Sequence, residues 1–196
     1  MNHTRILAVD DEPLNLAIIE EYLCEEPNYT LDTAQDGECA WTALEGTAKP
    51  YDLVILDRMM PVLDGMALLS RMKADARFAD IPVIMQTAAA APEQVREGMA
   101  AGAYYYLTKP YEPETLCAVV RAAIGDRHAL RSALSRAESL ERAFQQLTEV
   151  EFRFRTLDEA SQLAQLLSDF CPSPQSVLFG LTELMVNAVE HGNLGI

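Results

Sequence analysis

The fold is decided by residues 53–65, which read LVILDRMMPVLDG. The first four positions, Leu53 to Leu56, are all apolar, which is typical of a central strand that is covered on both faces. A carboxylate, Asp57, follows this strand directly, and the Asp64-Gly65 pair marks a turn before the next helical pattern. This stretch therefore predicts a buried parallel strand that ends in an acidic side chain.

Further apolar runs rich in β-forming residues lie on either side of this strand. The predicted strands are Ile6–Val9, Tyr29–Ala34, Leu53–Leu56, Val83–Met85 and Tyr104–Leu107. The stretches between them space their apolar residues at helical intervals. Strands that alternate with helices of this length indicate repeated βαβ units around a parallel sheet. The predicted fold class is α/β, with a doubly wound, five-stranded parallel sheet over residues 1–125.

The charge of the chain excludes some classes of function. Its 196 residues carry a formal net charge of −15, and residues 1–64 alone hold 14 acidic side chains against 3 basic ones. Residues 158–196 contain 5 acidic and no basic side chains. Nucleic acids and anionic membranes both need a basic face, so we expect neither as a partner, and we expect no DNA-binding output in the tail.

The sequence fits a cytoplasmic protein. No apolar run approaches the roughly 18 residues of a membrane span, and residues 1–5 lack the pattern of a signal peptide. The four cysteines, at positions 24, 39, 117 and 171, are scattered and form no CxxC pair. We therefore expect reduced thiols and a cytoplasmic location.

A helical pattern continues from about Pro113 to Val150, with Gly125 as the expected break. Beyond Gly125, apolar residues recur at alternating spacings of three and four, which gives a heptad-like seam. The seam consists of Leu130, Ala133, Ala137, Leu140, Phe144 and Leu147. Two interpretations fit residues 126–151: a solvated helix packed on its own domain, or a parallel two-helix connector that joins the protomers of a homodimer. We favour the dimer because the α/β domain is complete before the seam begins.

The last part of the chain predicts a short α+β segment. Phe152–Leu157 alternates apolar and polar side chains, which predicts a strand. A helix is expected over Asp158–Phe170. After a turn, Ser173 can cap a second helix that has Pro174 in its first position and runs to about His191.

Polar side chains follow several predicted strands at the points where these strands end. Asp10 and Asp11 follow the first strand, and Asp57 follows the third. Thr87 ends the fourth strand, and Lys109 follows the fifth. Open α/β folds bind ligands at this edge of the sheet, and converging carboxylates favour Mg²⁺, which takes oxygen ligands. A metal, a carboxylate nucleophile, a hydroxyl and an ammonium make a site for phosphoryl transfer.

These residues and the motifs around them resemble the receiver domain of two-component response regulators. The matching positions are the Asp10-Asp11 pair, Asp57 with Met60-Pro61 and Asp64-Gly65, Thr87-Ala88, Tyr106, and Lys109-Pro110. Each motif alone is weak, but all of them in order, each at a strand end, are highly specific. The resemblance covers residues 5 to about 125 and implies a flavodoxin-like receiver fold.

The resemblance also implies a role for each matching residue. Asp57 would be phosphorylated in a phosphorelay by a sensor histidine kinase or a phosphotransfer protein, and the receiver would catalyse only its own phosphorylation and dephosphorylation. Lys109 would contact the phosphoryl group and precede a cis bond to Pro110. Thr87 would be the switch threonine, and Tyr106 the aromatic residue that turns inward with it. The ligands of Mg²⁺ would be Asp10, Asp11, Asp57 and the carbonyl of Met59.

Two positions bear on the lifetime of the phosphoaspartate. Met59 lies two residues after Asp57, and Ala89 lies two residues after Thr87. In the family these positions often carry polar groups that help or hinder the attacking water, and neither side chain here can orient water. We therefore expect slow hydrolysis in the absence of a partner protein. Gln86, which precedes Thr87, is given no role.

A second resemblance lies in the last predicted helix. Glu183, Asn187 and His191 are spaced by four and share one helix face. Their Glu-x-x-x-Asn-Ala-x-x-His-Gly pattern resembles the N-box of the ATP-binding domain of histidine kinases and anti-sigma-factor serine kinases. It implies that Asn187 is a ligand of Mg²⁺–ATP and that Glu183 is a base, while His191 matches the motif alone. The alternative is a solvated polar face, with Gly192 as the helix cap.

The chain ends before the Asp-x-Gly-x-Gly segment and the glycine-rich lid of that ATPase family. We therefore expect residues 152–196 to be the N-terminal part of an incomplete domain, which would bind ATP only if the missing part were present. The expected function is a response regulator that signals through residues 126–151 to an anti-sigma-type serine kinase. The alternative is a non-enzymatic, phosphorylation-gated module that binds a sigma-factor regulator protein or a second copy of the chain.

Overall fold

The computed structural model of the chain describes residues 3–24, 28–88, 91–145, 152–171 and 173–192. The elements in chain order are β1 (Thr4–Val9), α1 (Pro13–Leu23), β2 (Tyr29–Ala34), α2 (Gly37–Gly46), β3 (Leu53–Asp57), α3 (Gly65–Ala74), β4 (Val83–Thr87), α4 (Pro92–Ala100), β5 (Tyr105–Thr108), α5 (Pro113–Gln145), α6 (Leu157–Asp169) and α7 (Pro174–Gly192). The chain divides into two compact units, Met1–Leu140 and Glu141–Ile196.

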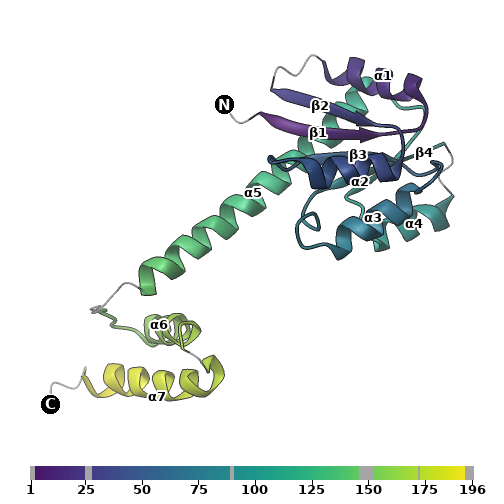
Figure 1. The fold of residues 1–196 in the computed structure, drawn as a ribbon. Coiled ribbons are helices and arrows are strands. Elements are labelled where there is room, and N and C mark those ends of the chain that lie inside the picture. Colours follow the sequence, from purple (N-terminus) through teal and green to yellow (C-terminus); the bar gives the residue numbers. More distant parts are fainter. Residues whose placement is uncertain (1–2, 25–27, 89–90, 146–151, 172, 193–196) are drawn as a thin grey trace. The chain divides into compact units, whose positions relative to one another are not determined.

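The first unit contains a five-stranded sheet with the order β2-β1-β3-β4-β5, in which all neighbouring strands are parallel (Figure 1). The chain runs from β1 outward to β2 and then returns to β3 on the other side of β1. The carboxyl ends of β1 and β3 therefore lie at the point where the strand order reverses, which is where open α/β sheets bind ligands. The predicted doubly wound sheet is confirmed.

Two apolar layers cover the faces of this sheet. One layer packs α2 and α3 on the sheet and includes Trp41 and Leu68. The other packs α1 and α5 on the opposite face and includes Ile19 and Val120. Figure 1 shows these two groups of helices on opposite sides of the strands. The central strand β3 is buried at every position, as its unbroken apolar run predicts.

Helix α5 runs from Pro113 to Gln145 without interruption, so the predicted break at Gly125 is wrong. One glycine costs a helix only about 1 kcal/mol, and contacts beside it with the rest of the first unit offset this cost. The hydroxyl of Tyr104 donates to the carboxylate of Asp126 at 2.7 Å. The buried Arg127 donates to the backbone carbonyl of Tyr51. The last helix of the α/β unit therefore continues without a break into the predicted connector, as far as Gln145.

The described part of the second unit contains the end of α5 and the helices α6 and α7, which pack against each other. Both predicted helices are confirmed, but the predicted strand Phe152–Leu157 is wrong. Residues 152–155 have no regular secondary structure, and Leu157 is the first residue of α6. Thr156 and Glu159 form a capping box that starts the helix there. The described part of this unit is helical, not α+β.

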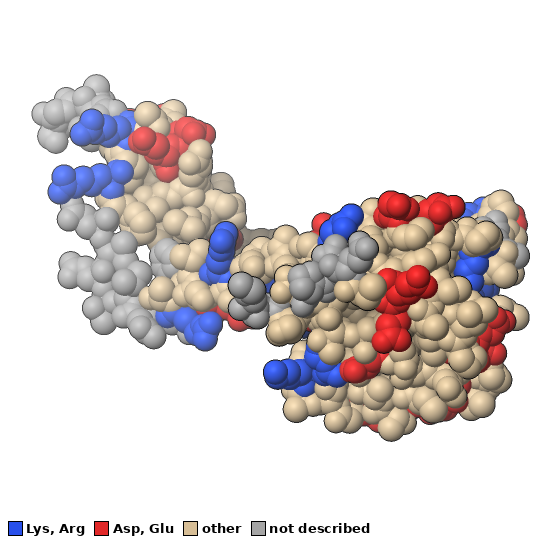
Figure 2. Space-filling view, turned by 90° about the horizontal axis from the view of Figure 1, so that it is seen from above, with Lys and Arg blue, Asp and Glu red and all other residues tan. Residues whose placement is uncertain are grey.

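The surface of the first unit is rich in acidic side chains. Figure 2, in which this unit lies on the right, shows several separate groups of Asp and Glu on the visible face and fewer Lys and Arg. This surface agrees with the 30 acidic and 15 basic residues of the sequence. Among the described helices, none has both the length and the apolar character needed to cross a membrane.

Candidate functional site

The carboxyl ends of the strands surround a cavity of about 430 Å³. Its lining includes Asp10, Asp11, Asp57, Met59, Thr87 and Lys109. The structure therefore brings together the site residues that were predicted in the first unit, with the exception of Tyr106.

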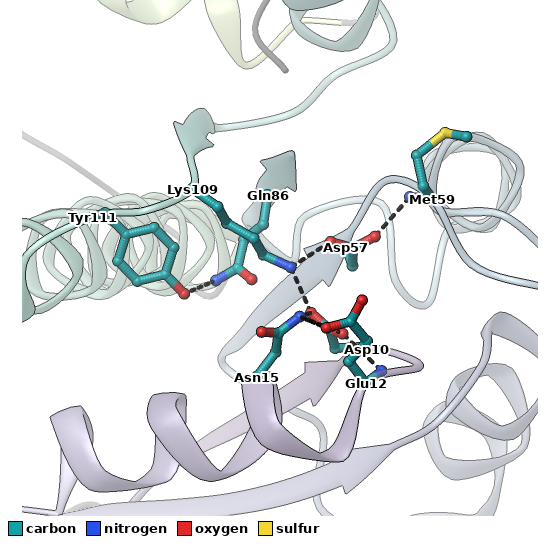
Figure 3. A network of polar contacts seen from close by, with 8 residues as sticks. All are labelled: Asp10, Glu12, Asn15, Asp57, Met59, Gln86, Lys109 and Tyr111. Atoms are coloured by element: carbon teal, nitrogen blue, oxygen red, sulfur yellow. Dashed lines mark hydrogen bonds and ion pairs between the residues drawn. The ribbon is translucent and has the colours of Figure 1, made fainter. Parts of the chain in front are cut away.

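The ammonium group of Lys109 lies between two buried carboxylates. Its Nζ is 2.6 Å from Asp10 Oδ2 and 2.5 Å from Asp57 Oδ1 (Figure 3). Asp10 is 1% exposed and Asp57 is 8% exposed. Two carboxylates in so little water repel each other, and the shared cation offsets that repulsion. The three side chains come from the ends of β1, β3 and β5, so the sheet itself sets their spacing.

Asp10 is also held by residues that the sequence analysis did not identify. The side-chain amide of Asn15 donates to both of its oxygens, at 3.0 and 3.1 Å, and the backbone N–H of Glu12 donates to Oδ1 at 2.9 Å. Asn15 lies in the first turn of α1, where its amide faces the carboxylate at the end of β1 (Figure 3). A polar residue in the helical turn that follows an acidic pair is the sequence signal that could have found it.

Asp57 is fixed by its backbone as well as by its side chain. The backbone N–H of Met59 donates to Asp57 Oδ2 at 2.7 Å. Helix α3 begins so close to β3 that a Cβ atom on Gly65 would lie 2.1 Å from the carbonyl oxygen of Asp57, which explains the glycine of the Asp64-Gly65 turn. Burial raises the pKa of the Asp57 carboxyl above its ordinary value, and the hydrogen bond from Lys109 opposes this shift.

The ends of β4 and β5 complete the site. Thr87 is buried, and its backbone carbonyl accepts a hydrogen bond from the backbone N–H of Lys109 at 2.8 Å. The predicted cis bond between Lys109 and Pro110 is confirmed. Gln86 is also buried, and its amide donates to the hydroxyl of Tyr111 at 2.7 Å beside Lys109 (Figure 3). Burial raises the pKa of Tyr111 to about 12, so its hydroxyl stays neutral at ordinary pH.

Tyr106 lies outside the cavity lining, on β5. It is half-buried and packs against the core layer of α2 and α3. Its hydroxyl accepts a hydrogen bond from Arg58 Nη1 at 2.8 Å. Ala89, the other residue with a predicted influence on hydrolysis, lies outside the described residues.

The oxygen donors of the cavity suit a hard cation. Mg²⁺ binds proteins through one or two carboxylates and keeps several waters, and Asp11 is exposed at the cavity beside the buried Asp10. In the described part of the chain, no group of three or more His, Cys, Asp or Glu side chains is placed so that it could hold a metal ion. A Mg²⁺ ion that keeps several waters needs only one or two carboxylates from the protein.

A doubly wound sheet with a carboxylate pair and a bridging lysine at its carboxyl edge defines a receiver-type domain. The chain belongs to the response regulator receiver domain family, whose model matches residues 6–121. The first unit is thus the receiver of a two-component response regulator.

Similar curated proteins have regulatory names of several kinds. Response regulator Rre1 of Synechocystis sp. is 29% identical over 93% of this chain and 78% of its own length. The DNA-binding dual master transcriptional regulator RpaA of the same organism is 36% identical over 78% of this chain and 61% of its own length. The gliding motility regulatory protein of Myxococcus xanthus is 41% identical over 54% of this chain and 13% of its own length. The chain thus spans less than two thirds of the last two relatives.

Solved receiver structures share the fold of the first unit. Chemotaxis protein CheY4 of Vibrio cholerae is 30% identical, with a TM-score of 0.57, over 61% of this chain and 98% of its own. The receiver domain of sensor histidine kinase PA1611 of Pseudomonas aeruginosa is 30% identical, with a TM-score of 0.56, over 62% of this chain and 98% of its own. That structure has a magnesium ion coordinated in its active-site cleft.

The predicted N-box residues lie on α7, away from any family match. The side chains of Glu183 and Asn187 are both exposed, as residues four apart on one outer face of the helix would be. The side chain of His191 lies outside the described residues. The comparisons identify the receiver and a helical C-terminal region, and they identify no ATPase domain.

Proposed function

We propose that Asp57 accepts a phosphoryl group from a sensor histidine kinase or a phosphotransfer protein. The observation that supports this most strongly is the pairing of Asp57 with Lys109 in a cavity at the reversal point of the sheet. The carboxylate is the nucleophile of the site, and the ammonium is positioned beside the oxygen atoms that would gain negative charge.

The transfer is a substitution at phosphorus. An oxygen of Asp57 forms a bond to phosphorus while the phosphorus–nitrogen bond of the donor phosphohistidine breaks, and the imidazole keeps the electron pair and takes up a proton. Lys109 is held by Asp10 on its other side, so it stays in place as the charge on Asp57 changes. The side chains of Thr87 and Tyr106 would move in response to the new phosphoryl group. Their movement would shift the population of conformations around β4 and β5.

We assign the Mg²⁺ site to Asp10, Asp11, Asp57 and the carbonyl of Met59. The donor chemistry of the cavity supports this assignment, and the magnesium ion in the similar PA1611 receiver adds to it. A bound Mg²⁺ would neutralise phosphoryl oxygens that Lys109 does not reach.

Incubation with a small phosphodonor such as acetyl phosphate tests the assignment. The full chain should gain one phosphoryl group in its intact mass, only in the presence of Mg²⁺, and Asp57→Asn should abolish the gain. The matched control is Asp64→Asn, which alters an exposed capping aspartate on the same loop. A gain that survives Asp57→Asn would refute the assignment.

We also propose that the phosphoaspartate hydrolyses slowly without a partner. The side chain of Met59 is exposed and points away from Asp57 (Figure 3), and a thioether cannot act as a base toward water. A phosphoprotein half-life of seconds would contradict this proposal.

A second copy of the chain is the partner that α5 fits best. Three leucines on the part of α5 beyond Gly125 are more than half exposed: Leu130, Leu134 and Leu140. Two of them belong to the predicted heptad seam, and such seams bury their apolar residues against a parallel helix. Sedimentation of the phosphorylated and unphosphorylated chain tests this dimer, and Leu130→Ser should weaken it. Of the other seam residues, the side chain of Phe144 and the whole of Leu147 lie outside the described part of the chain.

We propose that residues 152–196 carry the output, whether as part of an anti-sigma-type serine kinase or as a protein-binding module. The exposed polar pair Glu183 and Asn187 on α7 supports a ligand-facing role. Serine phosphorylation of a sigma-factor regulator protein, by a version of the chain that carries the rest of the ATPase pattern, separates the two candidates. Phosphorylation that requires ATP and that Asn187→Ala removes would favour the kinase, and its absence would favour the binding module.

A further inference from the structure

Arg58 follows Asp57 directly and reaches two elements of the receiver at once. Its Nη1 donates to the hydroxyl of Tyr106 on β5 at 2.8 Å, and its Nη2 lies 2.6 Å from Glu97 Oε2 on α4. Nη1 also lies 3.4 Å from the backbone carbonyl of Gln94, one turn earlier on α4. One guanidinium therefore connects the end of β3 to both α4 and β5.

The ring of Tyr106 packs directly against α4 at Gly98, and this inward position of the ring, called its seat below, requires glycine there. A Cβ atom on Gly98 would lie 2.4 Å from Tyr106 Cε2, so any larger residue at that position would displace the ring. The ring packs inward against the core layer of α2 and α3. Arg58 holds the hydroxyl end of a side chain whose ring is already seated against the helix.

The two contacts of Arg58 differ in strength. The side chain of Arg58 is 12% exposed and that of Glu97 is 60% exposed, so water and salt screen the ion pair. The bond to Tyr106 lies on the half-buried side and has a charged donor, which strengthens it relative to a neutral hydrogen bond. Tyr106 is therefore the partner whose loss should matter more.

The same arginine borders the cavity of Asp57. Arg58 and Gln94 both line that cavity, together with Asp57 itself. The backbone of Arg58 is fixed there, since its N–H donates to the carbonyl of Gln86 at 2.9 Å and its carbonyl accepts from Gly65 at 3.0 Å. A ligand on Asp57 and the seat of Tyr106 thus share one rigidly attached residue.

We propose that Arg58 is a positioning residue that couples the Asp57 site to α4 and β5 by holding Tyr106 in its inward seat. The proposal rests on the proposed roles of Asp57 as phosphoacceptor and Tyr106 as switch residue. Because coupling between two sites is reciprocal, a phosphoryl mimic on Asp57 and the inward Tyr106 each stabilise the other. Loss of Arg58 should weaken both.

Beryllofluoride binding to the full chain tests this coupling. Amide NMR can follow the binding of beryllofluoride in the presence of Mg²⁺. We expect Arg58→Met to raise the dissociation constant about tenfold, because the loss of one charge-assisted hydrogen bond changes a binding constant by about that factor. Amide hydrogen exchange in α4 should become faster by a similar factor. Arg58→Lys should restore part of the loss, because an ammonium can bind one of the two partners but lacks the fork that holds both. The control is Arg96→Met, which removes a largely exposed arginine of α4.

A double-mutant cycle separates positioning from a direct charge effect. Tyr106→Phe removes the hydroxyl and leaves every charge in place. If Arg58 acts through Tyr106, Tyr106→Phe should weaken beryllofluoride binding too, and the double variant should be no weaker than Arg58→Met. Additive losses, or unchanged binding in Arg58→Met, would overturn the proposal. Failure of the wild-type chain to bind beryllofluoride would instead refute the role of Asp57. Amide hydrogen exchange in α4 would then still test whether Arg58 stabilises α4 through its contacts with Tyr106 and Glu97.

Discussion

Replacement of Lys109 by methionine should destabilise the receiver in the absence of metal. The change keeps most of the side-chain volume and removes the cation that lies within 2.6 Å of Asp10 and 2.5 Å of Asp57. Breaking a buried charge pair by removing one partner costs about 3–5 kcal/mol. The cavity admits water, so we expect the lower end, about 3 kcal/mol. For a protein of this size that loss corresponds to about 6–12 °C in the midpoint of thermal unfolding.

Tryptophan fluorescence measures this loss in the receiver alone. Trp41 is the single tryptophan of the chain and is buried in the core layer of α2 and α3. Unfolding of the Lys109→Met variant should be followed in a chelator and again with millimolar Mg²⁺. Mg²⁺ should raise the lowered midpoint part of the way back, because it supplies positive charge to the same carboxylates. Lys49→Met, at an exposed lysine, is the matched control. A Lys109→Met midpoint in chelator equal to that of wild type would refute the electrostatic account of the site.

Three further predictions test other parts of the structure. Gly98→Ala should weaken beryllofluoride binding as NMR measures it, because the new Cβ would collide with the Tyr106 ring; unchanged affinity would argue against the seat. Gly125→Ala should raise the free energy of unfolding by about 0.5–1 kcal/mol in urea, because a Cβ there meets no atom within 4 Å and the position is helical; a loss would contradict the continuous α5. The hydrogen bonds from Arg77 lower the pKa of Asp75 to about 2. The contribution of Asp75 to the stability of the folded chain should therefore be complete above about pH 4 and disappear as the pH falls through 2. An NMR titration of the Asp75 carboxyl group can check this pKa.

Strand-end positions allowed most of the site to be predicted. In a parallel sheet, the residue after each strand lies at a common edge, so Asp10, Asp57 and Lys109 could be brought together from their positions alone. Asn15 and the Gln86–Tyr111 pair could not, because their contacts depend on how helices and strands pack rather than on spacing along the chain. For Asn15 the sequence offers only its place in the helical turn after the acidic pair, and for Gln86 and Tyr111 it offers no pattern that distinguishes them from other core residues.

The errors of the prediction have physical causes too. Gly125 lowers helix propensity, but the bonds of the neighbouring Asp126 and Arg127 to the rest of the receiver outweigh that preference. The alternation in Phe152–Leu157 fits a strand only if a neighbouring strand pairs with it, and the capping box at Thr156 starts a helix instead. Arg58 was missed because its importance lies in reaching Tyr106, 48 residues away in the sequence.

Chemical mapping of the phosphorylated residue tests the central claim most directly. The full chain, phosphorylated by a cognate kinase or acetyl phosphate with Mg²⁺, should be treated with borohydride, which reduces an aspartyl phosphate to homoserine. Peptide mapping should then find homoserine at position 57 in the wild-type chain and at no position in Asp57→Asn. Homoserine at another aspartate of the wild-type chain, or a phosphoryl group that resists borohydride, would contradict the assignment of Asp57 as the phosphoacceptor.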